Sequence, residues 1–272
     1  MKFALLVASR NKLPKERVKT AANGLRQAIK KAGHSVVEPI PSPTANGSVE
    51  SLAEAKAFAK FLHDQEGAYD GVVLSLMNFS EEGSASYAVS EVKTPILLHA
   101  DSDDIDKLGM PTRKDAYCGK LAFMGVMKQF GIKFTALQPH SCAYESKDFA
   151  ENLNLFASVC KIVNGMRRCR VGTIGSRINS FKTVRLDETV LQSYGIGSDM
   201  FDLSELVLRV NKLKDGEEKV KARKAQLLAY ADFSAVPDGK MDTLAKLGVA
   251  LDSIVEENAL DCFSSRCWTE LQ

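Results

Sequence analysis

The chain of 272 residues is long enough for two domains of ordinary size, and its 45% hydrophobic residues can fill a core in each. The 36 Lys and Arg residues nearly balance the 34 Asp and Glu residues, and no long run of one sign occurs. This balance argues against nucleic acid and against an anionic membrane as partners, and it favours small ligands. No apolar stretch reaches the roughly 18 residues of a membrane span, and the N-terminal apolar run is too short for a signal peptide. We therefore expect a soluble, cytoplasmic protein.

Six cysteines are scattered along the chain and form no C-x-x-C pair. In a chain of this length, such spacing is typical of reduced thiols that are mostly buried, and it argues against a disulfide framework or a zinc site. The cysteines are Cys118, Cys142, Cys160, Cys169, Cys262 and Cys267.

Apolar strand-like runs and helical periodicities alternate through the first part of the chain. FALLVAS (3–9) predicts a strand, Pro14 opens a helix that runs to residue 32, and Ser48 is the expected N-cap of a helix that ends near residue 64. Further strands are expected at 35–40, 71–77, 95–100 and 133–138, with helices at 82–92, 116–130 and 147–165. Five strands with helices between them predict an open parallel sheet that is covered on both faces.

A second unit is expected to begin after the basic turn at residues 166–170, where RVGTIGS starts a new strand. The rest of the chain is predicted to contain a strand at DMFDL, several helices and a last strand at CFSSRCW. We therefore predict two doubly wound, Rossmann-like or flavodoxin-like α/β/α domains with parallel sheets. Their expected bounds are residues 1–166 and 167–272, with 3–9 and 171–174 as inner strands.

Polar turns follow several of the predicted strands, at the edge where open α/β sheets bind ligands. Ser, Asn and Asp also form turns and caps without any ligand, and this interpretation is favoured for Ser9, Ser80 and Ser102. His99 and the acids at 101, 103 and 104 are likewise better explained by capping and solvation than by a metal.

GTIGSR (172–177) resembles a phosphate-binding turn only weakly, because it lacks the full G-x-G-x-x-G spacing. No complete dinucleotide fingerprint is found anywhere in the sequence.

A wider pattern resembles a known family. RVGTIGSRINSFKTVRLDETVLQSYGIGSDMFDLSEL (170–206) and, less specifically, GVVLSLMNFSEEGSASYAVSEVKTPILLHA (71–100) are similar to segments of L-fucose isomerase and L-arabinose isomerase family proteins. The tail ENALDCFSSRCWTELQ (257–272) resembles the point where the middle domain of that family gives way to its catalytic C-terminal domain.

The resemblance implies a metal-dependent enzyme that interconverts an aldose and a ketose. Family members hold a divalent metal, typically Mn²⁺, with carboxylates and a histidine that lie beyond the Cys-Trp segment. Residues 1–272 are thus expected to contain no catalytic residue, metal ligand or cofactor, to lack the catalytic domain and to be inactive alone. Phe263, Cys267 and Trp268 are then expected to be partly exposed.

The resemblance also indicates which residues contact a sugar. Arg266 and Trp268 occupy the position of a polar and aromatic pair near the substrate, although Trp268 can equally be an apolar plug. Arg177 and Asn78 lie on strand-end turns that face a neighbouring subunit's sugar in a homo-oligomer. The sequence does not identify the sugar.

Two other functions remain open from the sequence. One is a stand-alone, two-domain sugar-binding module, and the other is a flavodoxin-like nucleotide or flavin binder. For the latter, the turn SRNK (9–12) supplies only one basic loop.

Overall fold

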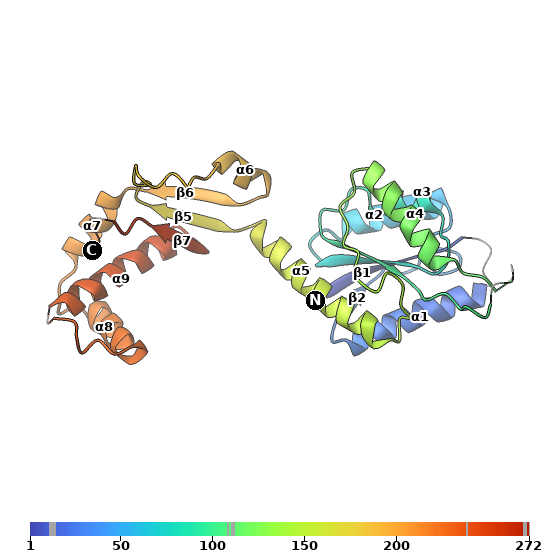
Figure 1. The fold of residues 1–272 in the computed structure, drawn as a ribbon, viewed down its shortest axis with the longest axis horizontal. Helices are drawn as coiled ribbons and strands as arrows, with labels where there is room; N and C mark the ends of the chain where they lie inside the picture. Colours follow the sequence, from blue (N-terminus) through green and yellow to red (C-terminus); the bar gives the residue numbers. More distant parts are fainter. Residues whose placement is uncertain (11–14, 108, 110–111, 238, 269–270, 272) are drawn as a thin grey trace. The chain divides into compact units, whose positions relative to one another are not determined.

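The computed structural model describes residues 1–10, 15–107, 109, 112–237, 239–268 and 271, which form two compact units, Met1–Asn164 and Gly165–Gln272 (Figure 1). Each unit contains a parallel β-sheet flanked by helices, which confirms the predicted fold class. Pro14, the predicted start of the first helix, lies outside the described residues. No helix in the described part of the chain is both long enough and apolar enough to cross a membrane.

The first sheet has four parallel strands in the order β2-β1-β3-β4. Their bounds are β1 (Lys2–Ala8), β2 (Ser35–Val37), β3 (Gly71–Leu76) and β4 (Ile96–Ala100). β1 is an inner strand, as predicted, and it pairs with β3 from Phe3 opposite Gly71 to Ala8 opposite Leu76.

Helices cover both faces of this sheet (Figure 1). Alternate residues of β1 enter different cores: Ala4 and Leu6 pack on one side, and Phe3 and Leu5 pack on the other. Because successive side chains of a strand point to opposite faces, an inner parallel strand with helices on both faces is expected to be mostly apolar. The helices of the first side are α2 (Leu52–Asp64), α3 (Glu82–Val89) and α4 (Ala116–Gln129), and those of the second are α1 (Lys15–Lys31) and α5 (Lys147–Met166).

The predicted N-cap of α2 at Ser48 is wrong, because the helix begins one turn later. The backbone next to Ser48 is extended, since Val49 N–H donates to the Val7 carbonyl at 2.8 Å. Ser51 is the N-cap: its hydroxyl accepts from Glu54 N–H and donates to the Glu54 carboxylate at 3.0 Å. The same carboxylate accepts from Glu50 N–H at 2.9 Å. Ser51 and Glu54 therefore stabilise the start of α2 reciprocally, in a variant of the capping box in which the carboxylate accepts from the N–H of the residue before the N-cap.

The fifth strand predicted at residues 133–138 is reduced to a single bridge between Leu97 and Thr135. Thr135 exchanges two backbone hydrogen bonds with β4, at 2.7 and 2.9 Å. Phe134 packs into the core on one side of the sheet and Leu137 into the core on the other. The apolar residues of this segment are thus packed on both faces of the sheet, although its described residues form no further backbone pairing with β4.

The second unit contains a three-stranded parallel sheet in the order β6-β5-β7, with β5 as the inner strand, as predicted. Helices α7, α8 and α9 pack with Ile174 and Phe201 on one face of it. The alternate residues, such as Met200 (64% exposed), lie on the other face, which stays largely open to solvent. The elements are β5 (Arg170–Ile174), α6 (Glu188–Ser193), β6 (Gly197–Phe201), α7 (Leu203–Lys212), α8 (Glu218–Tyr230), α9 (Lys240–Glu257) and β7 (Cys262–Ser265).

Replacement of Phe156 tests the core formed by β1 and α5. Phe156 is fully buried, with its ring centroid 5.4 Å from that of Phe3. We expect Phe156→Ala to lower the free energy of unfolding by about 3–5 kcal/mol through the lost burial and the cavity. Leu155 precedes it on α5 but is 53% exposed, so Leu155→Ala is the matched control with a change below about 1 kcal/mol. Urea unfolding followed by circular dichroism measures both variants, and equal losses would contradict this packing.

Candidate functional site

Polar side chains gather at the carboxyl edge of the first sheet and are buried there. Ser9 follows β1, Asn78 and Ser80 follow β3, and His99 and Asp101 lie at the end of β4. A buried polar group costs free energy unless it is hydrogen-bonded, so the partners of these residues show what each one does.

The two serines have structural partners. Ser9 and the buried Ser48 both donate to Glu50 Oε1, at 2.7 and 2.9 Å. Ser80 Oγ lies 2.9 Å from the Ala8 carbonyl and 3.1 Å from the Asn78 carbonyl, both of which can accept its proton. These contacts hold the turns in place, in agreement with the turn-forming interpretation from the sequence.

Asn78 supports the turn after β1. Its Oδ1 accepts from Arg10 N–H at 3.0 Å, and its Nδ2 donates to the Arg10 carbonyl at 3.3 Å. The Arg10 guanidinium lies over the Phe79 ring, 4.7 Å from the centroid. Asn78 therefore positions Arg10, and the Arg10 guanidinium is a cationic group that this turn presents.

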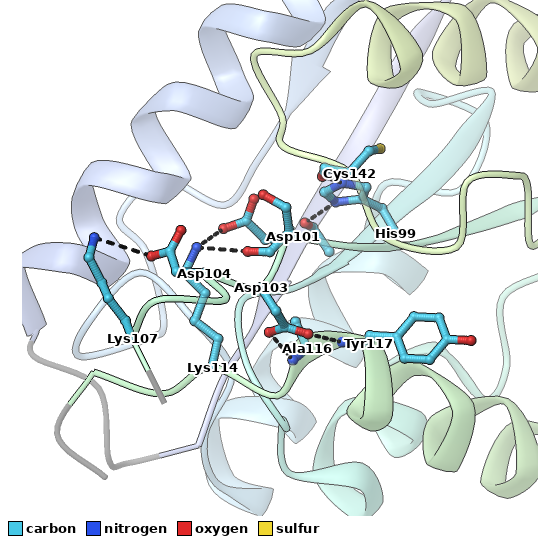
Figure 2. A network of polar contacts seen from close by, with 11 residues as sticks. His99, Asp101, Asp103, Asp104, Lys107, Lys114, Ala116, Tyr117 and Cys142 are labelled. Carbon is cyan, nitrogen blue, oxygen red and sulfur yellow. Dashed lines mark hydrogen bonds and ion pairs between the residues drawn. The ribbon is translucent and has the colours of Figure 1, made fainter. Parts of the chain in front are cut away.

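His99 is buried and held at both ring nitrogens (Figure 2). Nε2 lies 2.9 Å from the Cys142 carbonyl, which can only accept, so this nitrogen carries the proton. Nδ1 then accepts from the Ser75 hydroxyl at 2.7 Å. Burial lowers the pKa of His99 to about 4, against the opposing effect of the Cys142 carbonyl. At neutral pH the imidazole is uncharged.

The three acids after β4 have separate partners (Figure 2). Asp101 forms a largely buried ion pair with Lys114 at 2.8 Å, and burial raises the pKa of the Asp101 carboxyl while Lys114 opposes the rise. Asp103 accepts from Ala116 N–H and Tyr117 N–H at 2.8 and 3.0 Å, which caps the start of α4. Asp104 pairs with Lys107 at the surface. Capping is thus confirmed for Asp103, whereas the ion pair of Asp101 is not apparent from the sequence.

The described residues do not fit the Mn²⁺ that the family resemblance implies. No group of three or more His, Cys, Asp or Glu side chains among them is arranged to hold a metal ion. The acids after β4 are engaged by cations or by helix N–H groups. We therefore assign no metal-dependent step to these residues.

A small pocket of about 320 Å³ opens at this same edge of the first sheet. Asp101 and Lys114 contribute its charged wall, together with Arg17 from α1. Tyr144 also lines it, and burial raises the pKa of the Tyr144 hydroxyl to about 12. Lys114 and Tyr144 are pocket residues that the sequence does not single out, because their neighbours in the chain are ordinary loop residues.

The second unit brings together three of the four residues predicted to contact a sugar. Arg177, Arg266 and Trp268 line one pocket of about 750 Å³ at the carboxyl end of β5. Thr173 and Met200 form its floor on the open face of the sheet. Asn78 belongs to the first unit and is not part of this pocket.

Two arginines of this pocket hold its two aromatic residues. Arg177 Nη1 donates to the Phe181 carbonyl at 2.9 Å, and Arg266 Nε donates to the Trp268 carbonyl at 2.6 Å. The Phe181 and Trp268 rings lie 5.3 Å apart at an angle of 57°, within the range of a favourable aromatic pair. Phe263, Cys267 and Trp268 (47% exposed) are partly exposed, as expected.

Glycine is required at position 175 for two reasons. Its φ of +79° is in the left-handed region, and a Cβ there would lie 3.1 Å from Arg266 Cβ. The Gly175 N–H donates to the Phe201 carbonyl at 2.8 Å, and no helix begins before α6 in the described part of this turn. This strand end therefore places Arg266 against β5, and the Gly175 N–H is used within the sheet edge.

All six cysteines are free, but the prediction that they are mostly buried is wrong for half of them. Cys262 lies on the exposed strand β7 and Cys267 lies in the tail. Cys118 lies on α4, which has only one face in the core. Such positions cannot be recognised from spacing alone.

The buried His99 should make the stability of the fold depend on pH. Its pKa is about 4 in the folded state, below the ordinary value of 6.5, so the unfolded chain binds the proton more readily. Stability should be fully present above pH 6.5 and fall as the pH drops toward 4, by about 2–3 kcal/mol between pH 7 and 4.5. Urea unfolding of His99→Gln should lack this part of the pH dependence, whereas the exposed control His63→Gln should retain it. An NMR titration that finds His99 protonated near pH 6.5 would refute the assignment, even if the variant does not fold.

The first unit coincides with a known family domain. A family model described as "Fucose/sulfoquinovose isomerase, N-terminal domain" matches residues 4–167, which is more than half of the chain. A comparison with curated proteins finds no match. The family resemblance is thereby confirmed for the N-terminal domain. With an N-terminal part like that of a sugar isomerase, the chain belongs to the fucose/sulfoquinovose isomerase N-terminal domain family.

Proposed function

We propose that residues 1–272 form the substrate-positioning, N-terminal part of a cytoplasmic sugar isomerase that interconverts an aldose and a ketose. The observation that carries this proposal is the family match over residues 4–167. The first unit supplies the matched domain, and the second unit supplies a pocket of suitable size for a small ligand.

The chemistry of the reaction defines what these residues do not provide. Isomerisation moves a proton between C1 and C2, which requires a base near those carbons and a Lewis acid on the sugar oxygens. His99 is held at both ring nitrogens, and Asp101 is paired with Lys114. We therefore assign the base and the Mn²⁺ site to a further, metal-binding domain of the kind found in the family. Residues 1–272 alone are then inactive.

Substrate positioning is assigned to the pocket around Trp268. An indole ring offers a flat apolar surface on which the C–H face of a sugar can stack, and Arg177 and Arg266 offer hydrogen-bond donors beside it. Asn78 acts indirectly, by holding the turn that presents Arg10. In the homo-oligomer that the family resemblance implies, this turn faces the sugar of a neighbouring subunit.

A stand-alone sugar- or nucleotide-binding module is the second candidate function. It is favoured by one observation, namely that the described residues lining the pocket around Trp268 all lie between Thr173 and Trp268 of a single unit. A ligand could then bind there without any other part of a protein.

An isomerase assay tests the proposed division of labour. With Mn²⁺ present, residues 1–272 should produce no ketose from fucose or arabinose, because neither the base nor the polarising metal is in place. Isothermal titration with Mn²⁺ gives the complementary measurement. Tight one-to-one metal binding together with measurable turnover would show that the active site lies within these residues. A sugar-induced change in Trp268 fluorescence without turnover is the expected result.

A further inference from the structure

The pocket around Trp268 carries an excess of positive charge. Three arginines line it, Arg177, Arg185 and Arg266, and Glu188 is the only acid among its described lining residues. Three positive charges and one negative charge give the described lining residues of this pocket, of about 750 Å³, a net charge of two positive. An uncharged ligand gains nothing from this field, whereas an anion is attracted by it.

The hydrogen-bonding groups of the pocket point to the same conclusion. A guanidinium has five N–H donors and no acceptor, whereas each hydroxyl of a neutral sugar both donates and accepts. The described lining residues include no Asn, Gln, Asp or His, and besides Glu188 only Ser and Thr hydroxyls offer side-chain oxygens. A ligand group made only of acceptor oxygens suits such a lining better than a neutral sugar does.

Two of the guanidiniums can bind a ligand without giving up their present contacts. Arg177 uses Nη1 for the Ile178 and Phe181 carbonyls, and its other nitrogens have no partner among the described residues. Arg185 is exposed and makes no hydrogen bond or ion pair with another described residue. The aromatic pair of Phe181 and Trp268 lies in the same pocket, beside these cations.

We propose that the sugar bound in this pocket carries a phosphate group, an inference that rests on the proposed function. The arginines hold the phosphate, and the apolar face of the sugar ring lies against the aromatic pair. A phosphate group carries a charge of about −1.5 to −2 at pH 7, which balances the positive charge of the described lining residues. A sulfate ester carries a charge of only about −1. Arginine also recognises phosphate geometrically, through paired N–H···O bonds.

Tryptophan fluorescence provides a direct test, because Trp268 is the only tryptophan in the sequence and lines this pocket. Residues 1–272 are titrated with glucose, galactose and arabinose and with a phosphate ester of each. We expect at least one ester to bind at least tenfold more tightly than its parent sugar and to weaken as salt is added. Its affinity should also rise between pH 5 and 7.5 as the phosphate loses its second proton, whereas the matching sulfate ester should show no such rise.

Arg185→Gln should weaken binding of that phosphate ester at least tenfold and leave the affinity for the parent sugar unchanged. Arg168→Gln is the control, since Arg168 is an exposed arginine of the same unit outside the pocket. Equal affinity for each ester and its parent, or for phosphate and sulfate esters, would overturn this proposal and leave the proposed function intact. If no sugar or ester changes the fluorescence, sugar positioning at this pocket is refuted as well.

Discussion

An inner parallel strand must be covered on both of its faces, and the rest of the first unit depends on this constraint. β1 meets it by sending Ala4 and Leu6 to one core and Phe3 and Leu5 to the other. With both faces mostly apolar, the buried polar groups gather toward the carboxyl end of the sheet. The side chains after β1, β3 and β4 are buried there and are paired with hydroxyls, amides, carboxylates or backbone groups. The same packing that stabilises the sheet thus creates a rigid polar edge.

The second unit meets the constraint only in part. Its three strands are covered by α7, α8 and α9 on one face, and the opposite face leaves Met200 and Trp268 accessible. An open apolar face bordered by arginines is a place for a ligand or for another chain. The two units therefore differ: the first has helices on both faces of its sheet and only a small pocket at the polar edge, and the second has a larger pocket on the open face of its sheet.

The sequence predicts those features that depend on local apolar patterns. β1 and β5 are inner strands as expected. Every residue of β1 after Lys2 is buried, whereas only Gly172 and Ile174 are buried in β5. The start of α2 is misplaced, since Ser48 donates to Glu50 beside Ser9, a residue 39 positions away from Ser48 that no local pattern reveals. The segment around Thr135 has the composition of a strand but pairs at one residue only, and its apolar side chains Phe134 and Leu137 are instead accommodated in the cores on the two sides of the sheet.

The candidate sites show the same limit. Arg177, Arg266 and Trp268 line one pocket, although Arg177 and Trp268 are 91 positions apart in the sequence. The family resemblance indicated them, whereas spacing alone did not. Arg185 was missed because an exposed arginine in a loop has no distinguishing pattern. The pairing of Asp101 with Lys114, 13 residues later, is likewise a product of the fold.

The burial of Lys120 allows local opening at the polar edge to be measured by chemical labelling. The residue is 2% exposed, and its ammonium donates to the His140 carbonyl at 2.7 Å and has its pKa lowered to about 8 by burial. A reagent that modifies amines can reach it only when the segment around His140 separates from α4. The rate at which Lys120 is labelled therefore measures local opening at this edge, and a ligand that closes the edge would slow the labelling without any change in the reagent.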